Sequence, residues 1–220
     1  MAIPLIAPYP LSAACPPDAP VPEPVVDWSV DPGRAALLVH DMQAYFLAAY
    51  DRSREPVSTM IPNIRALIDA FDAAGAPVFY SVQPPVQAPA RRGLLTDFWG
   101  TGIADAEEAA VIPELAPRAH HHLITKWRYS AFERTDLRQA LSFARRDQLV
   151  VTGVYAHMGC QVSAADAFMN DIQPFLVADA VADFSAEEHR SAVQWVGRRA
   201  GVALRTGDVL EQFTTPGKGE

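Results

Sequence analysis

Short apolar runs and helical patterns alternate along the chain from residue 35 onward. Runs of strand length occupy residues 35–40, 77–82, 122–125, 149–154, 175–181 and 202–206. Apolar residues recur at helical spacing between Ile61 and Phe71, and Gly75 is placed to end that helix. Strands that are apolar throughout and separated by helices are typical of a mostly parallel sheet covered on both faces. The pattern therefore predicts an α/β fold.

Two further helices follow from local signals. The stretch "QALSFARRDQ" predicts a helix that closes before the strand at 149–154. Ser185, with Glu188 three residues later, forms a capping box that predicts a helix running to about Arg199.

The first 34 residues have a different character. The stretch "APYPLSAACPPDAPVPEP" is rich in proline, so regular structure cannot run for long there. We predict an N-terminal arm over residues 1–34 that lies over the domain and is anchored by the apolar side chains of "VVDWSV". Cys15 lies in this arm and is interpreted as incidental. Because there is no internal repeat, we predict a single domain over residues 1–220.

Composition narrows the class of protein. Half of the 220 residues are hydrophobic, which suits one globular domain with a full core. The net charge of -8, with no long basic run, disfavours a nucleic-acid binder. No apolar stretch is long enough to span a membrane, and the N-terminus lacks the features of a signal peptide. Two cysteines make no disulfide framework. We therefore expect a cytoplasmic protein.

Polar side chains follow directly after the predicted strands. In an open α/β sheet, ligands bind at the carboxyl ends of the strands. The residues found there are Asp41, Gln83, Lys126, Tyr155 and His157. An acid, an amide, an ammonium and a phenol are thus expected at one edge of the sheet, which predicts a shared site.

Other interpretations of these residues stay open at this point. Asp41 could cap the next helix, and Lys126 could be a solvated charge, although aromatic neighbours favour burial. His157 is more typical of a hydrogen-bonded structural residue than of a base. The triplet His120-His121-His122 resembles a metal-binding tract, but consecutive residues of a strand point to opposite faces. We therefore expect no metal and no cofactor.

Five stretches in order resemble the isochorismatase family, whose wider superfamily includes nicotinamidases and other cysteine hydrolases. They are "LLVHDMQAYF" (37–46), "RGLLTDFWG" (92–100), "TKWRYSAF" (125–132), "GVYAHMGC" (153–160) and "DIQPFLVADAVADFS" (171–185). The likeness covers nearly the whole chain and is strongest to members from siderophore and phenazine pathways. It implies a three-layer α/β/α fold with a mostly parallel six-stranded sheet, and a homodimer.

The resemblance also bears on Cys160. The nucleophile of the cysteine hydrolases matches Gly159 here, and Cys160 comes one residue later. On a helix, that residue is turned by about 100° from the nucleophile's direction. We therefore predict that Cys160 is a small buried hydrophobe and that the backbone at Gly159 leaves room for the substrate.

The resemblance implies hydrolysis of the vinyl ether of isochorismate, giving 2,3-dihydroxy-2,3-dihydrobenzoate and pyruvate. Asp41 is then the general acid, and Lys126 hydrogen-bonds both Asp41 and the enolpyruvyl group. The implied binding residues are Phe46, Gln83, Arg92, Trp99, Tyr129, Tyr155 and Gly159. Gln83 and Arg92 would hold carboxylates. The ring would be enclosed by Phe46, Trp99 and Tyr129, and the pyruvyl end would be contacted by Tyr155 and the backbone near Gly159. A cis peptide bond is implied between Val154 and Tyr155. Siderophore relatives often continue into a carrier domain, and we expect none here.

Three alternatives remain. The substrate could be 2-amino-2-deoxyisochorismate, giving 2,3-dihydro-3-hydroxyanthranilate as in phenazine-type pathways. The protein could instead be a cysteine amidase that uses Cys160 and Asp41, or a binding protein that keeps the pocket without catalysis.

Overall fold

The fold is a six-stranded parallel sheet between two layers of helices. The computed structural model describes residues 3–15 and 21–214. The strand order is β3-β2-β1-β4-β5-β6, and every pairing is parallel. The strands are β1 (Ala35–His40), β2 (Val78–Val82), β3 (His122–Thr125), β4 (Gln148–Val154), β5 (Gln173–Ala182) and β6 (Val202–Leu204). The predicted three-layer fold is confirmed, and the strand bounds differ by at most two residues.

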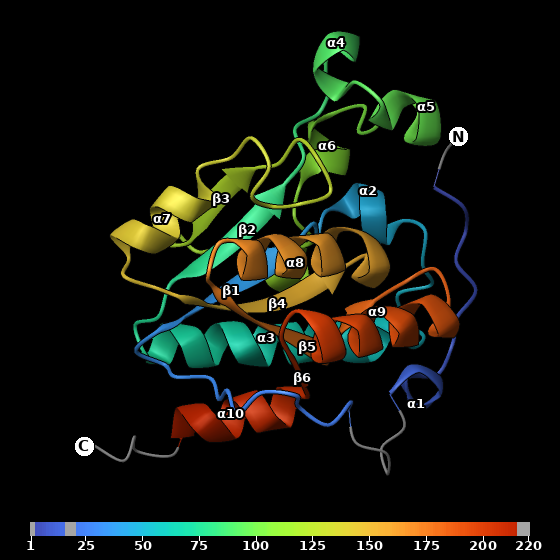
Figure 1. The fold of residues 1–220 in the computed structure, drawn as a ribbon. Helices are drawn as coiled ribbons and strands as arrows, with labels where there is room; N and C mark the ends of the chain where they lie inside the picture. Colours follow the sequence, from blue (N-terminus) through green and yellow to red (C-terminus); the bar gives the residue numbers. More distant parts are fainter. Residues whose placement is uncertain (1–2, 16–20, 215–220) are drawn as a thin grey trace.

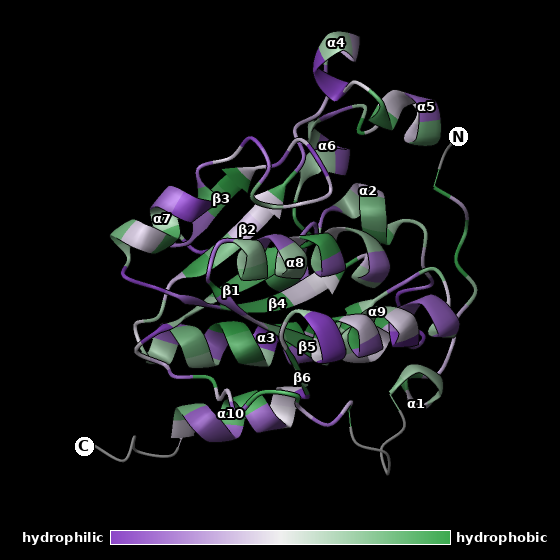
Figure 2. Cartoon of the chain, viewed as in Figure 1, coloured by the Kyte–Doolittle hydropathy of each residue, from purple (hydrophilic) through white to green (hydrophobic). Residues whose placement is uncertain are grey.

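Both faces of the sheet are buried in its central strands, which explains their continuous apolar runs, whereas the edge strand β3 exposes three of its four residues. Along β1 every residue is buried, and alternate residues enter two separate cores. Ala35, Leu37 and Val39 face one core, whereas Ala36 and Leu38 face the other. Figure 2 shows the strands as largely hydrophobic and the hydrophilic residues concentrated on the outer helices and loops.

The long helices cover these two faces. The first core includes residues of α3 (Val57–Ala73) and α10 (Thr206–Thr214), which pack together. The second core includes residues of α7 (Leu137–Phe143), α8 (Gln161–Met169) and α9 (Ala186–Arg199). In Figure 1, α8 and α9 lie in front of the sheet.

The predicted helix ends are present. Gly75 has φ +66° directly after α3, which ends there with Ala76 N–H donating to the Phe71 carbonyl at 2.9 Å. Ser185 Oγ accepts from Glu188 N–H at 3.2 Å, so the N-cap half of the predicted capping box is confirmed. The Glu188 carboxylate accepts from the Ser185 hydroxyl at 3.0 Å rather than from its backbone N–H.

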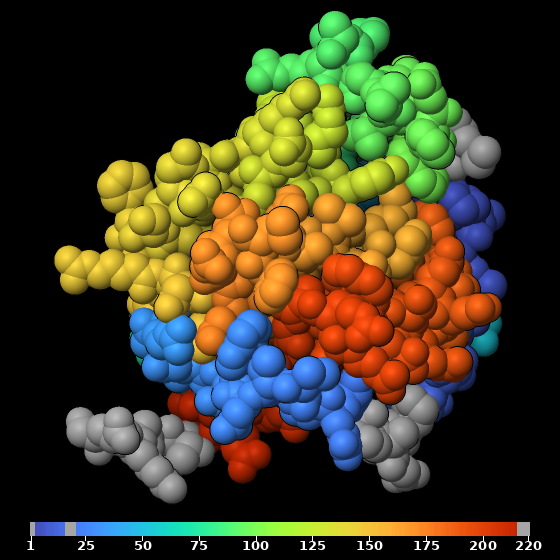
Figure 3. Space-filling model, in the orientation of Figure 1, coloured from blue at the N-terminus to red at the C-terminus, as the bar shows by residue number. Residues whose placement is uncertain are grey.

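The described part of the arm packs on the domain. It contains only the four-residue helix α1 (Leu11–Ala14), which contacts α9. Ile6 forms a bridge with Tyr50, and Val30 is buried, whereas Val25 is exposed. The arm residues from 21 onward, lighter blue in Figure 3, lie against the end of α9, where Pro22 is next to Gly197. Residues 1–2 and 16–20 of the predicted arm lie outside the described part.

Short elements gather at the carboxyl end of the sheet. They are α2 (Ala44–Leu47), α4 (Pro89–Arg92), α5 (Leu95–Trp99), α6 (Ala106–Ala109), the 3-10 turn η1 (Pro113–Leu115) and the π-helical turn η2 (Ala156–Cys160). In Figure 1 the strand arrows point toward α2, α5 and α6. Strand order reverses beside β1, where β2 lies on one side and β4 on the other, so this end is where an α/β sheet binds ligands. None of the described helices combines the length and apolarity needed to cross a bilayer.

Candidate active site

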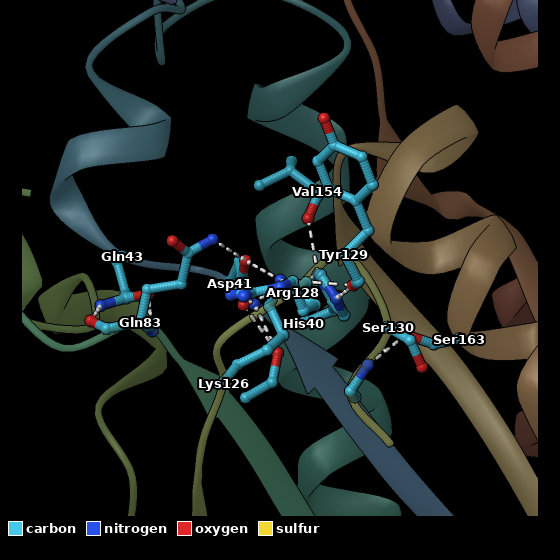
Figure 4. A network of polar contacts seen from close by, with 12 residues as sticks. His40, Asp41, Gln43, Gln83, Lys126, Arg128, Tyr129, Ser130, Val154 and Ser163 are labelled. Carbon is cyan, nitrogen blue, oxygen red and sulfur yellow. Dashed lines mark hydrogen bonds and ion pairs between the residues drawn. The ribbon is translucent and has the colours of Figure 1, made fainter. Parts of the chain in front are cut away.

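The buried carboxylate of Asp41 is contacted by two other predicted strand-end residues, Gln83 and Lys126. Asp41 follows β1 with φ +49°, and its Oδ2 lies 2.9 Å from Lys126 Nζ and accepts from Gln83 Nε2 at 3.2 Å. Its Oδ1 accepts from Ser81 Oγ at 2.7 Å. Figure 4 shows the Gln83 and Lys126 side chains converging on Asp41. The capping interpretation of Asp41 is wrong, because α2 begins only at Ala44.

The charges around Asp41 favour its ionised form. Burial alone would raise the pKa of Asp41. The charges of His40 and Lys126, with hydrogen bonds from Lys126 and Ser81, outweigh burial and lower this pKa below its usual value. Without substrate, Asp41 is therefore a carboxylate at neutral pH.

Lys126 is buried, so the solvated interpretation is wrong. Besides its ion pair with Asp41, the ammonium donates to the carbonyl oxygens of Arg128 at 2.7 Å and Tyr129 at 3.3 Å. An ammonium has three protons. All three already have acceptors, so the expected additional bond from Lys126 to a substrate would have to replace one of them.

The nine residues implied as catalytic or substrate-binding all line one cavity, whereas the strand-end residue His157 does not. They are Asp41, Phe46, Gln83, Arg92, Trp99, Lys126, Tyr129, Tyr155 and Gly159. The sequence analysis missed seven further lining residues, namely Ile3, His40, Tyr45, Leu95, Val154, Met158 and Phe184. Most of these are apolar residues with no local signal. His40 did carry one, since it is a polar residue at the end of an otherwise apolar strand.

Arg92 presents an uncompensated positive charge to this cavity. The residue is buried, and its Nε donates to the Gly100 carbonyl at 2.5 Å. Its Nη1 has no hydrogen-bond partner, and no carboxylate within the described ranges forms an ion pair with it. Burial lowers the pKa of Arg92, but arginine stays charged in proteins. A bound anion would satisfy this group.

Aromatic side chains form the walls. Trp99 Nε1 donates to the Tyr129 hydroxyl at 2.7 Å, which joins α5 to the loop after β3. Phe46 packs edge-on against Tyr155, with ring centroids 6.1 Å apart. The Tyr155 hydroxyl donates to the Phe46 carbonyl at 3.0 Å, so the hydroxyl is engaged within the wall. The Val154–Tyr155 peptide bond is cis, as predicted.

Cys160 is a buried core residue, as predicted. Its side chain belongs to the core on the α8 and α9 side, and its Sγ lies 3.8 Å from the Thr152 carbonyl. Burial raises the pKa of the thiol well above its usual value. Cys160 does not line the cavity, and neither does the other described cysteine, Cys15. A thiolate nucleophile is therefore not in place.

We expected the missing side chain of Gly159 to leave open space for the substrate, but it does not. A Cβ at this position would lie 2.0 Å from Cε1 of His40. The imidazole of His40 occupies the volume that the missing side chain was expected to free for a ligand.

Two histidine clusters lie apart from the cavity. His157 Nδ1 contacts Asp183 Oδ1 at 2.5 Å, as a hydrogen-bonded structural residue would. His120 and His121 precede β3 and both contact Asp72, so the argument that strand neighbours diverge does not apply to them. His121 Nδ1 accepts from a backbone N–H, which places the proton on Nε2, toward Asp72. That tautomer cannot coordinate a metal through Nε2.

The fold and the cavity define a class of protein. A buried acid at the end of β1 and a buried ammonium at the end of β3, beside an unpaired arginine and aromatic walls, suit acid–base chemistry on a small anionic molecule. The chain is thus an α/β enzyme whose cavity contains no cysteine among the described residues.

Comparison with known proteins gives the family. The isochorismatase domain model matches residues 35–207. The chain is 46% identical over 214 residues to isochorismatase from Bacillus subtilis, covering 97% of this chain and 67% of that protein. It is 45% identical over 210 residues to phenazine biosynthesis protein PhzD1 from Pseudomonas aeruginosa, covering 95% and 99%. A cysteine hydrolase from Pseudomonas syringae superposes with a TM-score of 0.80 at 24% identity, covering 87% and 98%, and shares the fold. The chain belongs to the isochorismatase family and is a hydrolase.

Proposed function

We propose that this protein hydrolyses the enolpyruvyl vinyl ether of isochorismate to 2,3-dihydroxy-2,3-dihydrobenzoate and pyruvate, with Asp41 as general acid and no covalent intermediate. The observation that carries this proposal is the buried Asp41 carboxylate in a cavity with an unpaired arginine and no lining cysteine. The identity of 46% to an isochorismatase over nearly the whole chain supports the substrate class.

The reaction needs a proton at carbon. Protonated Asp41 transfers its proton to the terminal methylene, and the vinyl ether becomes an oxocarbenium ion. Water adds to that cation and loses a proton, giving a hemiketal. The hemiketal collapses to pyruvate and the ring alcohol, and Asp41 recovers a proton. A well-positioned acid of this kind contributes about 10²- to 10⁴-fold in rate.

The charge balance of the cavity explains how Asp41 becomes an acid. In the unliganded protein, Lys126 lies 2.9 Å from it, and the pKa of Asp41 is low. The substrate brings two carboxylates into the same low-dielectric cavity. Their negative charge raises the pKa of Asp41, so that the bound complex takes up the proton that the reaction uses.

The other lining residues bind and orient the substrate. Arg92 and Gln83 hold its carboxylates, and the free Nη1 of Arg92 allows a charge-assisted bond. Phe46, Trp99 and Tyr129 pack around the ring. Tyr155 contributes its ring face, since its hydroxyl is engaged, and Gly159 contributes backbone. Lys126 orients Asp41 and the loop after β3.

The similarity to a phenazine biosynthesis protein supports 2-amino-2-deoxyisochorismate as a second candidate substrate. The chain is 45% identical to a phenazine biosynthesis protein and covers 99% of its length. The same residues could act on 2-amino-2-deoxyisochorismate and give 2,3-dihydro-3-hydroxyanthranilate, because the vinyl ether is unchanged.

Pyruvate release tests both substrates. Purified protein is supplied with isochorismate or its 2-amino analogue, and pyruvate is followed with lactate dehydrogenase and NADH. Rapid turnover of at least one supports the proposal, and the ratio of kcat/KM ranks the two. Tight binding of either without pyruvate release would instead identify a silent binding protein.

Three expectations stay part of this proposal. They are a homodimer, a cytoplasmic location and a single domain over residues 1–220. Light scattering coupled to size-exclusion chromatography measures the molar mass of the protein in solution. A monomer at all concentrations would contradict the dimer.

A further inference from the structure

His40 is the last residue of β1 and lies directly before Asp41, and its side chain points into the space that a side chain at Gly159 would occupy. A Cβ at Gly159 would lie 2.0 Å from Cε1 and 2.6 Å from Nε2 of the imidazole. A Cβ at Gly153, where φ is +106°, would lie 2.1 Å from the His40 carbonyl oxygen. Real Cβ contacts are never this short. The contact at Gly159 is with the imidazole and so depends on the His40 side chain, whereas the contact at Gly153 is with backbone atoms that any residue at position 40 would have.

The ring is held from both sides and cannot move away. Its Nδ1 lies 2.8 Å from the Val154 carbonyl oxygen at the end of β4, and its Nε2 lies 3.3 Å from the Tyr129 carbonyl oxygen. Lys126 donates to the same Tyr129 carbonyl. Figure 4 shows His40 between Val154 and the loop at Tyr129, beside Asp41. Only 1% of His40 is exposed.

We propose that His40 is a positioning residue of this site: its imidazole occupies the space of a side chain at position 159 and joins the end of β4 and the loop after β3 to the backbone of Asp41. The inference rests on the proposed function, in which Asp41 delivers the proton. His40 does not touch the reacting atoms. It acts through Asp41, whose carboxylate Oδ1 lies 3.8 Å from Nδ1.

The physical basis is the number of elements that meet at this one ring. β1 carries it, carbonyl oxygens of β4 and of the loop after β3 face its two nitrogens, and η2 packs Gly159 against it. Burial lowers the pKa of His40, so the ring is neutral and its single N–H can donate to only one of these oxygens; the shorter contact is with the Val154 carbonyl, at 2.8 Å. A smaller side chain would open a cavity beside the Asp41 backbone and leave the Val154 carbonyl without the imidazole, whereas the Tyr129 carbonyl would keep its bond from Lys126. A catalytic acid displaced by about 1 Å can lose about 100-fold in rate.

Unfolding experiments test the steric part of the proposal. Gly159→Ala, His40→Ala and the double variant are compared with the wild type by thermal unfolding. In the wild-type background, Gly159→Ala should lower Tm by roughly 2–10 °C, because the Cβ overpacks a held ring. In the His40→Ala background, the same change should have little further effect. If Gly159→Ala lowered Tm equally in the wild-type and His40→Ala backgrounds, the proposal that the His40 ring excludes a side chain at position 159 would be wrong.

Kinetics test positioning against simple packing. His40→Leu keeps most of the volume but has no donor, and it should lower kcat by about 10- to 100-fold with little change in KM. His40→Asn, whose amide can still donate toward the Val154 carbonyl, should recover part of that loss. Wild-type kcat in His40→Leu, or a rise in KM alone, would overturn the proposal.

His189→Leu is the matched control. His189 is also fully buried, and its Nε2 contacts a strand carbonyl, that of Ala178, at 2.8 Å, but it does not line the cavity. This variant should lose stability and keep kcat when assayed below its Tm. If the wild type releases no pyruvate from either substrate, the proposed function fails, whereas the unfolding comparison still decides whether His40 excludes a side chain at position 159.

Discussion

Replacing Asp41 by asparagine removes the acid while keeping its shape. The asparagine oxygen can face Lys126 and Gln83, which both donate, and its amide can face Ser81 Oγ, which can accept as well as donate. Every polar group in the cluster then keeps a partner. The variant therefore tests the loss of a transferable proton rather than the loss of a contact.

The expected magnitudes follow from the site. Loss of a positioned general acid should lower kcat by about 10²- to 10⁴-fold, with a smaller effect on KM. Removing one member of a buried ion pair generally costs about 3–5 kcal/mol of unfolding free energy. Lys126 keeps two carbonyl acceptors and gains an amide oxygen, so the loss here should be nearer about 1–3 kcal/mol.

The assay is pyruvate release from isochorismate, with unfolding in urea measured in parallel. Asp136→Asn is the control, because Asp136 is exposed and its side chain makes no capping bond to α7. It should retain wild-type kcat and stability. A folded Asp41→Asn variant with a kcat close to that of the wild type would refute the role of Asp41 as acid.

Four further predictions follow from the same contacts. Arg92→Met should raise KM by more than about tenfold because a charge-assisted bond to a carboxylate is lost, whereas the exposed neighbour Arg91→Met should leave KM unchanged; equal effects would contradict carboxylate binding by Arg92. Cys160→Ala should keep kcat, and iodoacetamide should not inactivate the native protein, since the thiol is buried and its pKa is raised; inactivation with labelling of Cys160 would restore the amidase hypothesis. Tyr155→Phe should lower the unfolding free energy by about 1 kcal/mol with little change in kcat, because its hydroxyl donates only to a backbone carbonyl; a large fall in kcat would show that the hydroxyl acts on the substrate. The pKa of Asp41 is lowered on folding, so its stabilising effect is present above its unfolded pKa of about 3.9 and is lost as pH falls through the lower folded value; the stability difference between wild type and Asp41→Asn should shrink below about pH 4, and a constant difference would contradict the lowered pKa.

The positions of the strands and helices were predictable because their signals are local. All six predicted runs became strands of the sheet. Strands such as β1 and β4 are apolar because both of their faces are buried, whereas the edge strand β3 exposes three of its four residues. Ser185 and Glu188 predict the start of α9 because a capping box involves only neighbouring residues. β5 begins two residues earlier than the apolar run, at Gln173, since backbone pairing with β4 does not require an apolar side chain.

The convergence of the site residues was predictable in outline. Asp41, Gln83 and Lys126 follow parallel strands, and the carboxyl ends of parallel strands share one edge of the sheet. The direction of each side chain was not predictable in the same way. Tyr155 was expected at the edge of the sheet and lines the cavity there, but the sequence did not show that its hydroxyl reaches the Phe46 carbonyl, a contact that depends on where α2 packs.

The sequence by itself determined the fold class, the residues at the strand ends and the absence of a nucleophile at position 159, since each depends on residue identity or on short-range spacing. Only the tertiary structure decided that His40 occupies the space beside Gly159, that three acceptors surround Lys126 and that Arg92 is left with a free donor. These features depend on contacts between segments far apart in the chain. Their distances are set by how the strands and loops pack, and no local pattern contains that information.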